Sequence, residues 1–557
     1  MADDQSRIEL TVDGQPVSVA GTAGGTRLSL LDVLRDQLRI TAVKDGCSPQ
    51  GQCGCCTVLV DGQPRVACVT PARRVAGRSV TTLDGLEPSH RDAWAEAFCA
   101  TGASQCGFCT PGIIVRLDAL AAKLDEASAA DHRAVDQALL AHLCRCTGWQ
   151  TIHEAWDLFR SGSDIGVADR DHAAAAARAE LEGGVDQIVG TDVAKGRGRF
   201  ASDTAPADAL VAMPDGAGGW AIGESVAEAR AAAGKVQGRR TTAGHQWPID
   251  VPDGTWAATI RTTWVEPAYL ETDASWCLPG GDPYTPLANG GAFGAKTGSR
   301  VQDAARSLAD EHGRSVLAIA SREDATRWGA KRPPIAGGVE ADGSGVIRVA
   351  RTPGIAAAIA SVAPGIRVEE VDVAGPPTSA AIRAAGWAEA AALLAGGRRQ
   401  RGWVLAPNGA MAAALIDADT GAISVAVACG PPLDEVVLRS YCVGAAHMAW
   451  SWLTSEAITI EPDGSIVDLT IRSFGVIRAV DTPPIDVTIV DRDHRPSERF
   501  GGLPGPLPEQ PVNGSDAVFA AVAGSGWLSL GCRQDWPIST QLDHIDNLDH
   551  TDNEESS

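Results

Sequence analysis

The sequence predicts an α+β protein built from several domains. Its 557 residues are enough for three or four domains, and an apolar fraction of 44% is ordinary for a globular chain. Near the N-terminus, apolar and polar residues alternate over short segments, which is the period of β-strands. From residue 83 to 162 apolar residues recur every three or four positions, as in helices, and both periods occur in the remainder.

Two β-hairpins and one helix are predicted within residues 1–82. Residues 7–19 alternate around the turn pair Asp13-Gly14, and a second hairpin is expected at 57–69 around Asp61-Gly62. Leucines at helical spacing follow a Thr/Ser start between residues 28 and 38. With a metal-binding loop between the helix and the second hairpin, this is the arrangement of a β-grasp ferredoxin domain.

That loop is rich in cysteine and glycine. Cys47, Cys53 and Cys56 have C-x5-C-x2-C spacing, and Cys68 follows after eleven residues. Plant-type ferredoxins hold a [2Fe–2S] cluster with C-x4-C-x2-C and a later fourth cysteine, so the first gap here is one residue longer. Glycines in the loop allow the backbone to turn around the sulfurs. We predict a first [2Fe–2S] site, with the spare Cys55 as the alternative to Cys47.

Residues 83–162 are predicted to form a helical domain with a second four-thiolate site. Cys106 and Cys109 form C-x2-C directly before a helix, whose N-terminus favours anionic thiolates. Cys144 and Cys146 form C-x-C at the end of a later helix. Zinc is the competing interpretation, but zinc ribbons rarely use C-x-C, and a disulfide fits less well still. The expected helices span 93–100, 110–124, 134–143 and 151–159.

The N-terminal residues and the composition indicate the cellular compartment of the protein and the class of its partners. Residues 1–5 lack the basic and apolar regions of a signal peptide, and no run of about twenty apolar residues predicts a membrane span. We therefore expect a cytoplasmic protein, in which clustered cysteines bind metal more often than they form disulfides. The net charge of −23 argues against nucleic acid as a partner.

Three cysteine motifs together resemble the iron–sulfur subunit of the molybdenum hydroxylases, the xanthine dehydrogenase and aldehyde oxidase family. They are Gly51–Val58, Gln105–Gly112 and Leu143–Gly148. The resemblance implies two [2Fe–2S] clusters that relay electrons from a molybdopterin cofactor to a flavin or another acceptor. It also implies that the side chain of Gln105 touches the pterin.

The chain continues well beyond such a subunit. Residues 163–182 are polar and alanine-rich and are predicted to be a linker with some helix. From 183 to 540, segments that include Gly290–Lys296 and Tyr441–Met448 resemble, in order, parts of the family's molybdopterin-binding subunit. The glycine-rich segment also suggests a P-loop, but that motif needs glycine where Ala295 stands. Residues 541–557 are acidic and predicted to be disordered.

Within the C-terminal region we expect strands at 423–427, 466–471 and 485–490 and a packing helix at 516–522. His447 lies among apolar residues and is expected to be packed rather than functional. The remaining cysteines lack ligand spacing and are expected to be buried thiols: Cys99, Cys277, Cys429, Cys442 and Cys532.

The C-terminal region departs from the family at its catalytic centre. The family's general base is the glutamate of a Gly-Glu-Pro-Gly segment, and the matching segment here is Gly502-Leu503-Pro504-Gly505. Leucine cannot accept a proton, and Glu509 lies six residues farther along. The region is also much shorter than the family's large subunit. The resemblance therefore implies a truncated, degenerate α+β molybdopterin-subunit-like region without catalytic residues.

The expected function is that of an electron-transfer subunit in a hetero-oligomeric molybdenum hydroxylase. A partner would hold most of the molybdopterin, as its cytosine dinucleotide, and would hydroxylate an aromatic heterocycle or an aldehyde, while FAD could be bound by another partner. The alternative is a self-contained molybdopterin hydroxylase with a non-standard base, which Leu503 and the shortened pocket argue against. A plain ferredoxin-like carrier does not explain why segments that resemble the family's large subunit follow residue 183 in the family's order.

Overall fold

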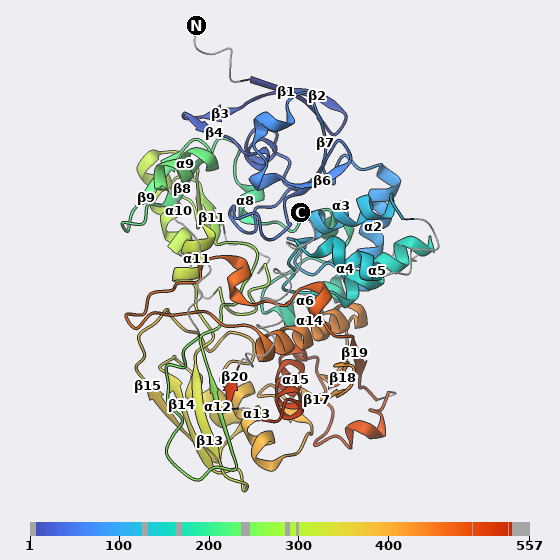
Figure 1. Cartoon of the computed structure of the whole chain (residues 1–557), viewed down its shortest axis with the longest axis vertical. Coiled ribbons are helices and arrows are strands. Elements are labelled where there is room, and N and C mark those ends of the chain that lie inside the picture. Colours follow the sequence, from blue (N-terminus) through green and yellow to red (C-terminus); the bar gives the residue numbers. More distant parts are fainter. Residues whose placement is uncertain are drawn as a thin grey trace, which may run out of the picture.

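The computed structural model describes residues 7–124, 132–162, 170–234, 245–284, 290–296, 300–492, 494–532 and 534–536. The N-terminal sheet lies at one end of the molecule, the cysteine-bearing helices lie beside it, and two sheets of the C-terminal region form the opposite end (Figure 1). No helix in the described part of the chain is long and apolar enough to cross a membrane.

The N-terminal sheet has the strand order β2-β1-β7-β5-β6. Its first hairpin turns at Asp13-Gly14, as predicted, and both turn residues have positive φ. The second hairpin ends at Val66, earlier than predicted, and a 3₁₀ turn at Ala67–Val69 carries Cys68. The strands are β1 (Arg7–Val12), β2 (Gln15–Ala20), β3 (Thr22–Ala23), β4 (Thr26–Arg27), β5 (Thr57–Val60), β6 (Gln63–Val66) and β7 (Ser79–Thr81).

The helix predicted at 28–38 is confirmed. Ser29 and Asp32 cap its start reciprocally, side chain to backbone, which favours helix initiation at this position. The helix begins as α1 (Leu30–Asp32) and continues as the π-helical turn η1 (Val33–Gln37).

All four helices predicted between 83 and 162 are present. They are α2 (Pro88–Thr101), α3 (Thr110–Ala121), α4 (His132–Leu139) and α5 (Gln150–Ser161). The rings of Trp94 and Phe159 stack with centroids 3.7 Å apart and join α2 to α5. Because α4 ends at Leu139, earlier than predicted, Cys144 and Cys146 lie in a loop rather than on the helix.

The predicted linker is in large part a packed helix, α6 (His172–Gly183). Its Arg178 and Glu182 are fully buried and ion-paired at 3.1 Å. The guanidinium group also donates to the carbonyls of Pro431, Pro432 and Val512. The polar sequence suggested a solvent-exposed segment, but these long-range contacts satisfy the buried charges. Residues 163–169 lie outside the described residues.

The C-terminal region contains three sheets, with orders β11-β12-β8-β9, β15-β14-β13-β10-β20 and β16-β17-β18-β19. Its strands are β8 (Leu210–Pro214), β9 (Trp220–Gly223), β10 (Ala258–Thr262), β11 (Ala274–Cys277), β12 (Val316–Ile319), β13 (Ile335–Val339), β14 (Gly345–Ala350), β15 (Ile366–Val371), β16 (Val404–Leu405), β17 (Met411–Ile416), β18 (Ile423–Ala428), β19 (Ile485–Ile489) and β20 (Asp535–Trp536). The predicted strands at 423–427 and 485–490 are therefore confirmed.

The strand predicted at 466–471 is wrong. Ile466 makes an isolated bridge with Ile460, and the chain then forms a 3₁₀ turn at Ile471–Phe474. Side chains take the place of a neighbouring strand here, because Asp468 accepts from the Thr459 N–H and Gln50 accepts from the Ile471 N–H. The alternation of apolar residues could not reveal these distant partners.

Helix α14 (Glu435–Thr454) runs across the middle of the molecule, between the cysteine-bearing helices and the sheet that contains β17 and β18 (Figure 1). Nearly every residue from Val437 to Thr454 is buried. It packs on α15 (Ser515–Ser529), which confirms and extends the helix predicted at 516–522. The remaining helices are α7 (Thr191–Ala194), α8 (Ala201–Thr204), α9 (Val226–Ala233), α10 (Arg300–His312), α11 (Arg322–Trp328), α12 (Ile355–Val362) and α13 (Trp387–Arg398).

The predicted acidic tail, 541–557, lies outside the described residues.

Candidate metal centres

The first predicted site gathers Cys47, Cys53, Cys56 and Cys68, all of them buried. The thiol of Cys47 contacts those of Cys53 and Cys68, and the thiol of Cys68 also contacts that of Cys56. Hydrogen bonds, first of all the one with Cys53, hold the pKa of Cys47 well below its usual value. The four sulfurs therefore form one continuous group, as a four-thiolate cluster requires.

Backbone N–H groups point at these sulfurs. The N–H groups of Gln50 and Gln52 donate to Cys47 Sγ at 3.2 and 3.5 Å, and the N–H of Cys68 donates to Cys56 Sγ at 3.4 Å. Such donors stabilise thiolates and, with them, the negative charge of a bound cluster. The residues present fit a [2Fe–2S] group.

Cys55 lies beside this group of four. Its thiol contacts that of Cys53 and lies 3.7 Å from the Cys53 carbonyl oxygen, and burial raises its pKa. Cys47, by contrast, contacts two other members of the group. This geometry favours Cys47 over Cys55 as the fourth ligand.

The second predicted site gathers Cys106, Cys109, Cys144 and Cys146, which are also buried. The sulfurs of Cys106 and Cys146 are 3.6 Å apart, and Cys109 contacts Cys144. Hydrogen bonds from Cys109 and then Thr147 lower the pKa of Cys144 to about 6. Four buried thiols beside the N-terminus of α3 fit a second cluster.

The loops of the two sites touch through their backbones. The N–H of Leu143 donates to the carbonyl of Cys53 at 3.1 Å. At Gly112 in α3, an added Cβ would lie 2.4 Å from the Gly54 carbonyl oxygen, so only glycine permits this approach. The ligands of the two sites are therefore joined by a single hydrogen bond and a few covalent bonds.

The C-terminal region encloses the loop that carries Cys144 and Cys146. A Cβ on Gly444 of α14 would lie 1.7 Å from the Cys146 carbonyl oxygen, and a Cβ on Gly291 would lie 3.4 Å from Cys146 Sγ. Arg145 in the same loop makes a bidentate ion pair with Glu456 at 2.5 and 2.7 Å, and both side chains are buried. The glycine-rich segment therefore packs against the second site.

Gln105 is buried between this loop and α14. Its Nε2 donates to the Cys146 carbonyl at 2.9 Å and to Ser440 Oγ at 3.0 Å, while its Oε1 has no hydrogen-bond partner among the described residues. The cavity beside it measures about 10 Å³, which is room for one water molecule at most. A molybdopterin does not fit beside Gln105 in this structure.

A second small cavity, of about 30 Å³, adjoins Gly291–Phe293. Three arginines line it and would be the groups to bind the phosphate of a pterin cofactor. All three are already neutralised: Arg145 pairs with Glu456, Arg332 with Glu389 and Arg383 with Asp516. Neither its volume nor its charge suits the cofactor.

The segment that resembles the family's Gly-Glu-Pro-Gly, residues 502–505, lies elsewhere. Leu503 is half-buried against an apolar cluster that includes Met411 and Phe500, on the sheet that contains β17 and β18. Glu509, the candidate for a displaced base, is exposed. Neither residue lines the cavities beside Gln105 and Gly291.

The expected burial of the other thiols and of His447 is confirmed with one exception. Burial lowers the pKa of His447 to about 3, so the ring is packed in its neutral form. Cys532 is half-buried rather than buried. The buried thiols are Cys99, Cys277, Cys429 and Cys442.

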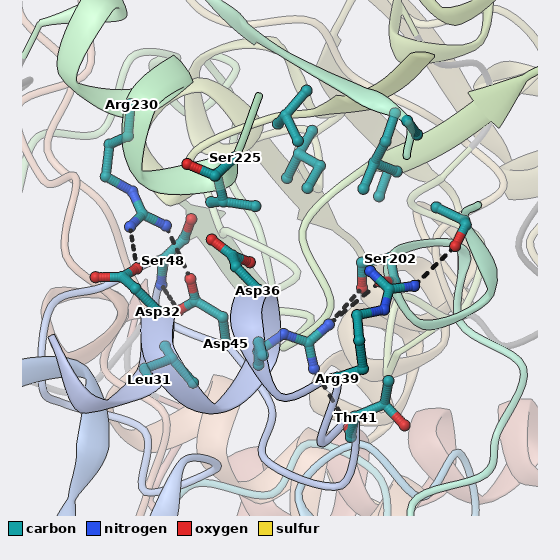
Figure 2. A pocket seen from close by; sticks show the side chains of 18 of the residues that line it. Leu31, Asp32, Asp36, Arg39, Thr41, Asp45, Ser48, Ser202, Ser225 and Arg230 are labelled. Atoms are coloured by element: carbon teal, nitrogen blue, oxygen red, sulfur yellow. Dashed lines mark hydrogen bonds and ion pairs between the residues drawn. The ribbon is translucent and has the colours of Figure 1, made fainter. Parts of the chain in front are cut away.

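A pocket of about 100 Å³ was not foreseen from the sequence. It lies where α9 meets α1, η1 and the loop before Cys47, and Figure 2 shows the polar side chains around it. Arg230 reaches Asp32 at 3.3 Å and Asp45 at 3.1 Å. Burial raises the pKa of Asp36 and of Asp45 to about 6. The residues that line the pocket come from distant segments of the sequence, so no local motif predicts it.

Comparisons with known proteins identify an iron–sulfur domain in this chain. Residues 82–157 match the family model described as a [2Fe-2S] binding domain. The chain is 39% identical over 146 residues to the xanthine dehydrogenase iron-sulfur-binding subunit of Escherichia coli O157:H7, a match that covers 26% of this chain and 88% of that protein. The chain belongs to the molybdenum hydroxylase family. It is also 39% identical over 145 residues to the isoquinoline 1-oxidoreductase subunit alpha of Brevundimonas diminuta, covering 26% of this chain and 91% of that one.

A solved molybdenum hydroxylase shares the fold of nearly the whole chain. The aldehyde oxidoreductase from Desulfovibrio gigas superposes with a TM-score of 0.68 at 14% sequence identity, covering 95% of this chain and 98% of that one. At this identity the match shows the fold alone. Because coverage is almost complete, the C-terminal region shares that mixed α and β fold.

Proposed function

We propose that this chain is the electron-transfer subunit of a molybdenum-containing hydroxylase or dehydrogenase, relaying electrons from a partner's molybdopterin to a flavin or another acceptor. The observation that carries this proposal is the presence of two groups of four buried thiols whose loops are hydrogen-bonded to each other. Two [2Fe–2S] clusters would supply one-electron redox chemistry. Their ligands would be Cys47, Cys53, Cys56 and Cys68 for the first and Cys106, Cys109, Cys144 and Cys146 for the second.

The chain's own residues would hold the clusters and exclude water from them. Backbone N–H groups at Gln50, Gln52 and Cys68 stabilise thiolate charge at the first site. Helix α14 and the Arg145–Glu456 pair fix the second loop from the side of the C-terminal region. This role as a scaffold explains why a folded C-terminal region without the family's base is retained.

The molybdopterin would be bound by a partner chain. The cavities of about 10 and 30 Å³ beside the second site are too small for the cofactor, and the arginines of the larger one are neutralised. The exposed position of Glu509 and the packing of Leu503 give no support to a self-contained hydroxylase.

Electron paramagnetic resonance of the purified, dithionite-reduced chain tests the proposal. We expect two distinct [2Fe–2S] signals, each integrating to one spin per chain, and reoxidation of both by dichlorophenolindophenol. A single signal, or zinc in place of iron at the second site, would refute the two-cluster relay.

A further inference from the structure

The surface beside the first site includes a basic stretch. The chain carries a net charge of −23, yet residues 62–83 contain four arginines and no acidic residue. Arg65, Arg73 and Arg74 are exposed and make no ion pair with any described residue. Three exposed arginines without an ion pair to a described residue therefore lie within eight residues of the proposed ligand Cys68.

An exposed apolar side chain lies in the same stretch. Val69 follows Cys68 directly and is 58% exposed, and no large apolar side chain among the described residues is more exposed. Its side chain covers Gly51 of the first cysteine loop, where an added Cβ would lie 2.8 Å from Val69 Cγ1. Val69 therefore offers one apolar contact beside the unpaired arginines.

The C-terminal region adds a further arginine near this site. The guanidinium group of Arg472 donates to the carbonyls of Gln52 at 3.3 Å and Leu140 at 2.9 Å, and the side chain is exposed. No acidic side chain in the described part of the chain forms an ion pair with it. The positive charges near the first site thus come from two segments that are far apart in sequence.

We propose that the surface formed by Arg65, Val69, Arg73, Arg74 and Arg472 docks an acidic electron-acceptor protein. This proposal rests on the relay function proposed above and specifies the class of its acceptor. Opposite charges accelerate diffusional encounter, and the acceleration falls as salt screens the charges. Because the chain as a whole is strongly acidic, these arginines favour the approach of an acidic partner on the side of the buried first site.

The test uses two probes that share one haem: native cytochrome c, which is basic, and succinylated cytochrome c, whose lysines carry carboxylates. The dithionite-reduced full chain with both clusters is mixed with each probe at low and at high salt. We expect faster electron transfer to the succinylated form at low salt, and a steep fall of that rate as salt rises. The double variant Arg73→Glu/Arg74→Glu is expected to slow it about tenfold or more at low salt.

Two controls separate the possible failures. The double variant Arg351→Glu/Arg367→Glu changes the net charge equally, at exposed positions on the β14–β15 side of the opposite end (Figure 1), and should leave the rate to succinylated cytochrome c nearly unchanged. Reduction of dichlorophenolindophenol, a small dye, should be the same in all variants. Loss of dye reduction in the unmodified chain would refute the relay itself. Normal dye reduction with no preference for the succinylated probe, or equal effects of the two double variants, would refute the docking surface alone. If Arg73→Glu/Arg74→Glu fails to fold, the double variant Arg73→Gln/Arg74→Gln takes its place.

Discussion

The contact between α14 and the second cysteine loop gives the sharpest test of the scaffold role. In Gly444→Ala the new Cβ would lie 1.7 Å from the Cys146 carbonyl oxygen, so the backbone of this proposed cluster ligand must retreat by more than about 1 Å. Overpacking of this kind costs about 3 kcal/mol, against which alanine in a helix interior gains about 1 kcal/mol over glycine. We expect a net loss of about 2 kcal/mol in the free energy of unfolding.

Denaturant unfolding and iron analysis measure this effect together. The variant should lose the signal of the second cluster, and with it about half of the iron, while the first signal remains. Gly524→Ala in α15 is the matched control, because its new Cβ would meet its nearest neighbour at an ordinary 3.6 Å. That change should leave both signals intact and should not reduce stability. A Gly444→Ala protein with unchanged stability and full iron content would refute the packing argument.

Three further predictions concern single side chains. Cys47→Ser should abolish the first cluster signal, whereas Cys55→Ser should keep both signals and the full iron content; the opposite result would make Cys55 the ligand. Glu456→Gln leaves the buried Arg145 without its counter-charge and should destabilise the chain by about 3–5 kcal/mol, measured by urea unfolding. Asp36 has a pKa raised to about 6 by burial, so the folded state holds its proton more tightly than the unfolded chain and stability should fall as pH rises from about 4 to 6. The Asp36→Asn variant should lose that part of the pH dependence, and an unchanged pH profile would contradict this reasoning.

The cysteine sites and the helices around them could be predicted because their signals are local. Cys53 and Cys56, like Cys106 and Cys109, are neighbours in sequence, and cluster chemistry dictates their spacing. Helix α3 could likewise be predicted from residue 110, because a proline occupies its first turn. Such features depend on residues within one or two turns of each other.

The features that could not be predicted from the sequence depend on contacts between distant segments. The charged side chains of Arg178 and Glu182 suggested a polar linker. The backbone carbonyls and amides that bind these side chains come from residues 431–432 and 512–515, so the local sequence could not reveal them. The strand expected at 466–471 failed for the same reason, since Gln50 supplies the acceptor for Ile471. The pocket in Figure 2 is lined by residues from 31–48, 108, 202–230, 271–274 and 317–319 and has no motif of its own.

The division of cofactors between this chain and a partner is the central claim, and metal analysis tests it most directly. Iron, acid-labile sulfide and molybdenum should be measured per chain in the protein purified alone and in its native complex. We predict four irons, four sulfides and no molybdenum in the isolated chain, with molybdenum present only in the complex. Stoichiometric molybdenum in the isolated chain, together with hydroxylase turnover that needs no partner, would contradict the account.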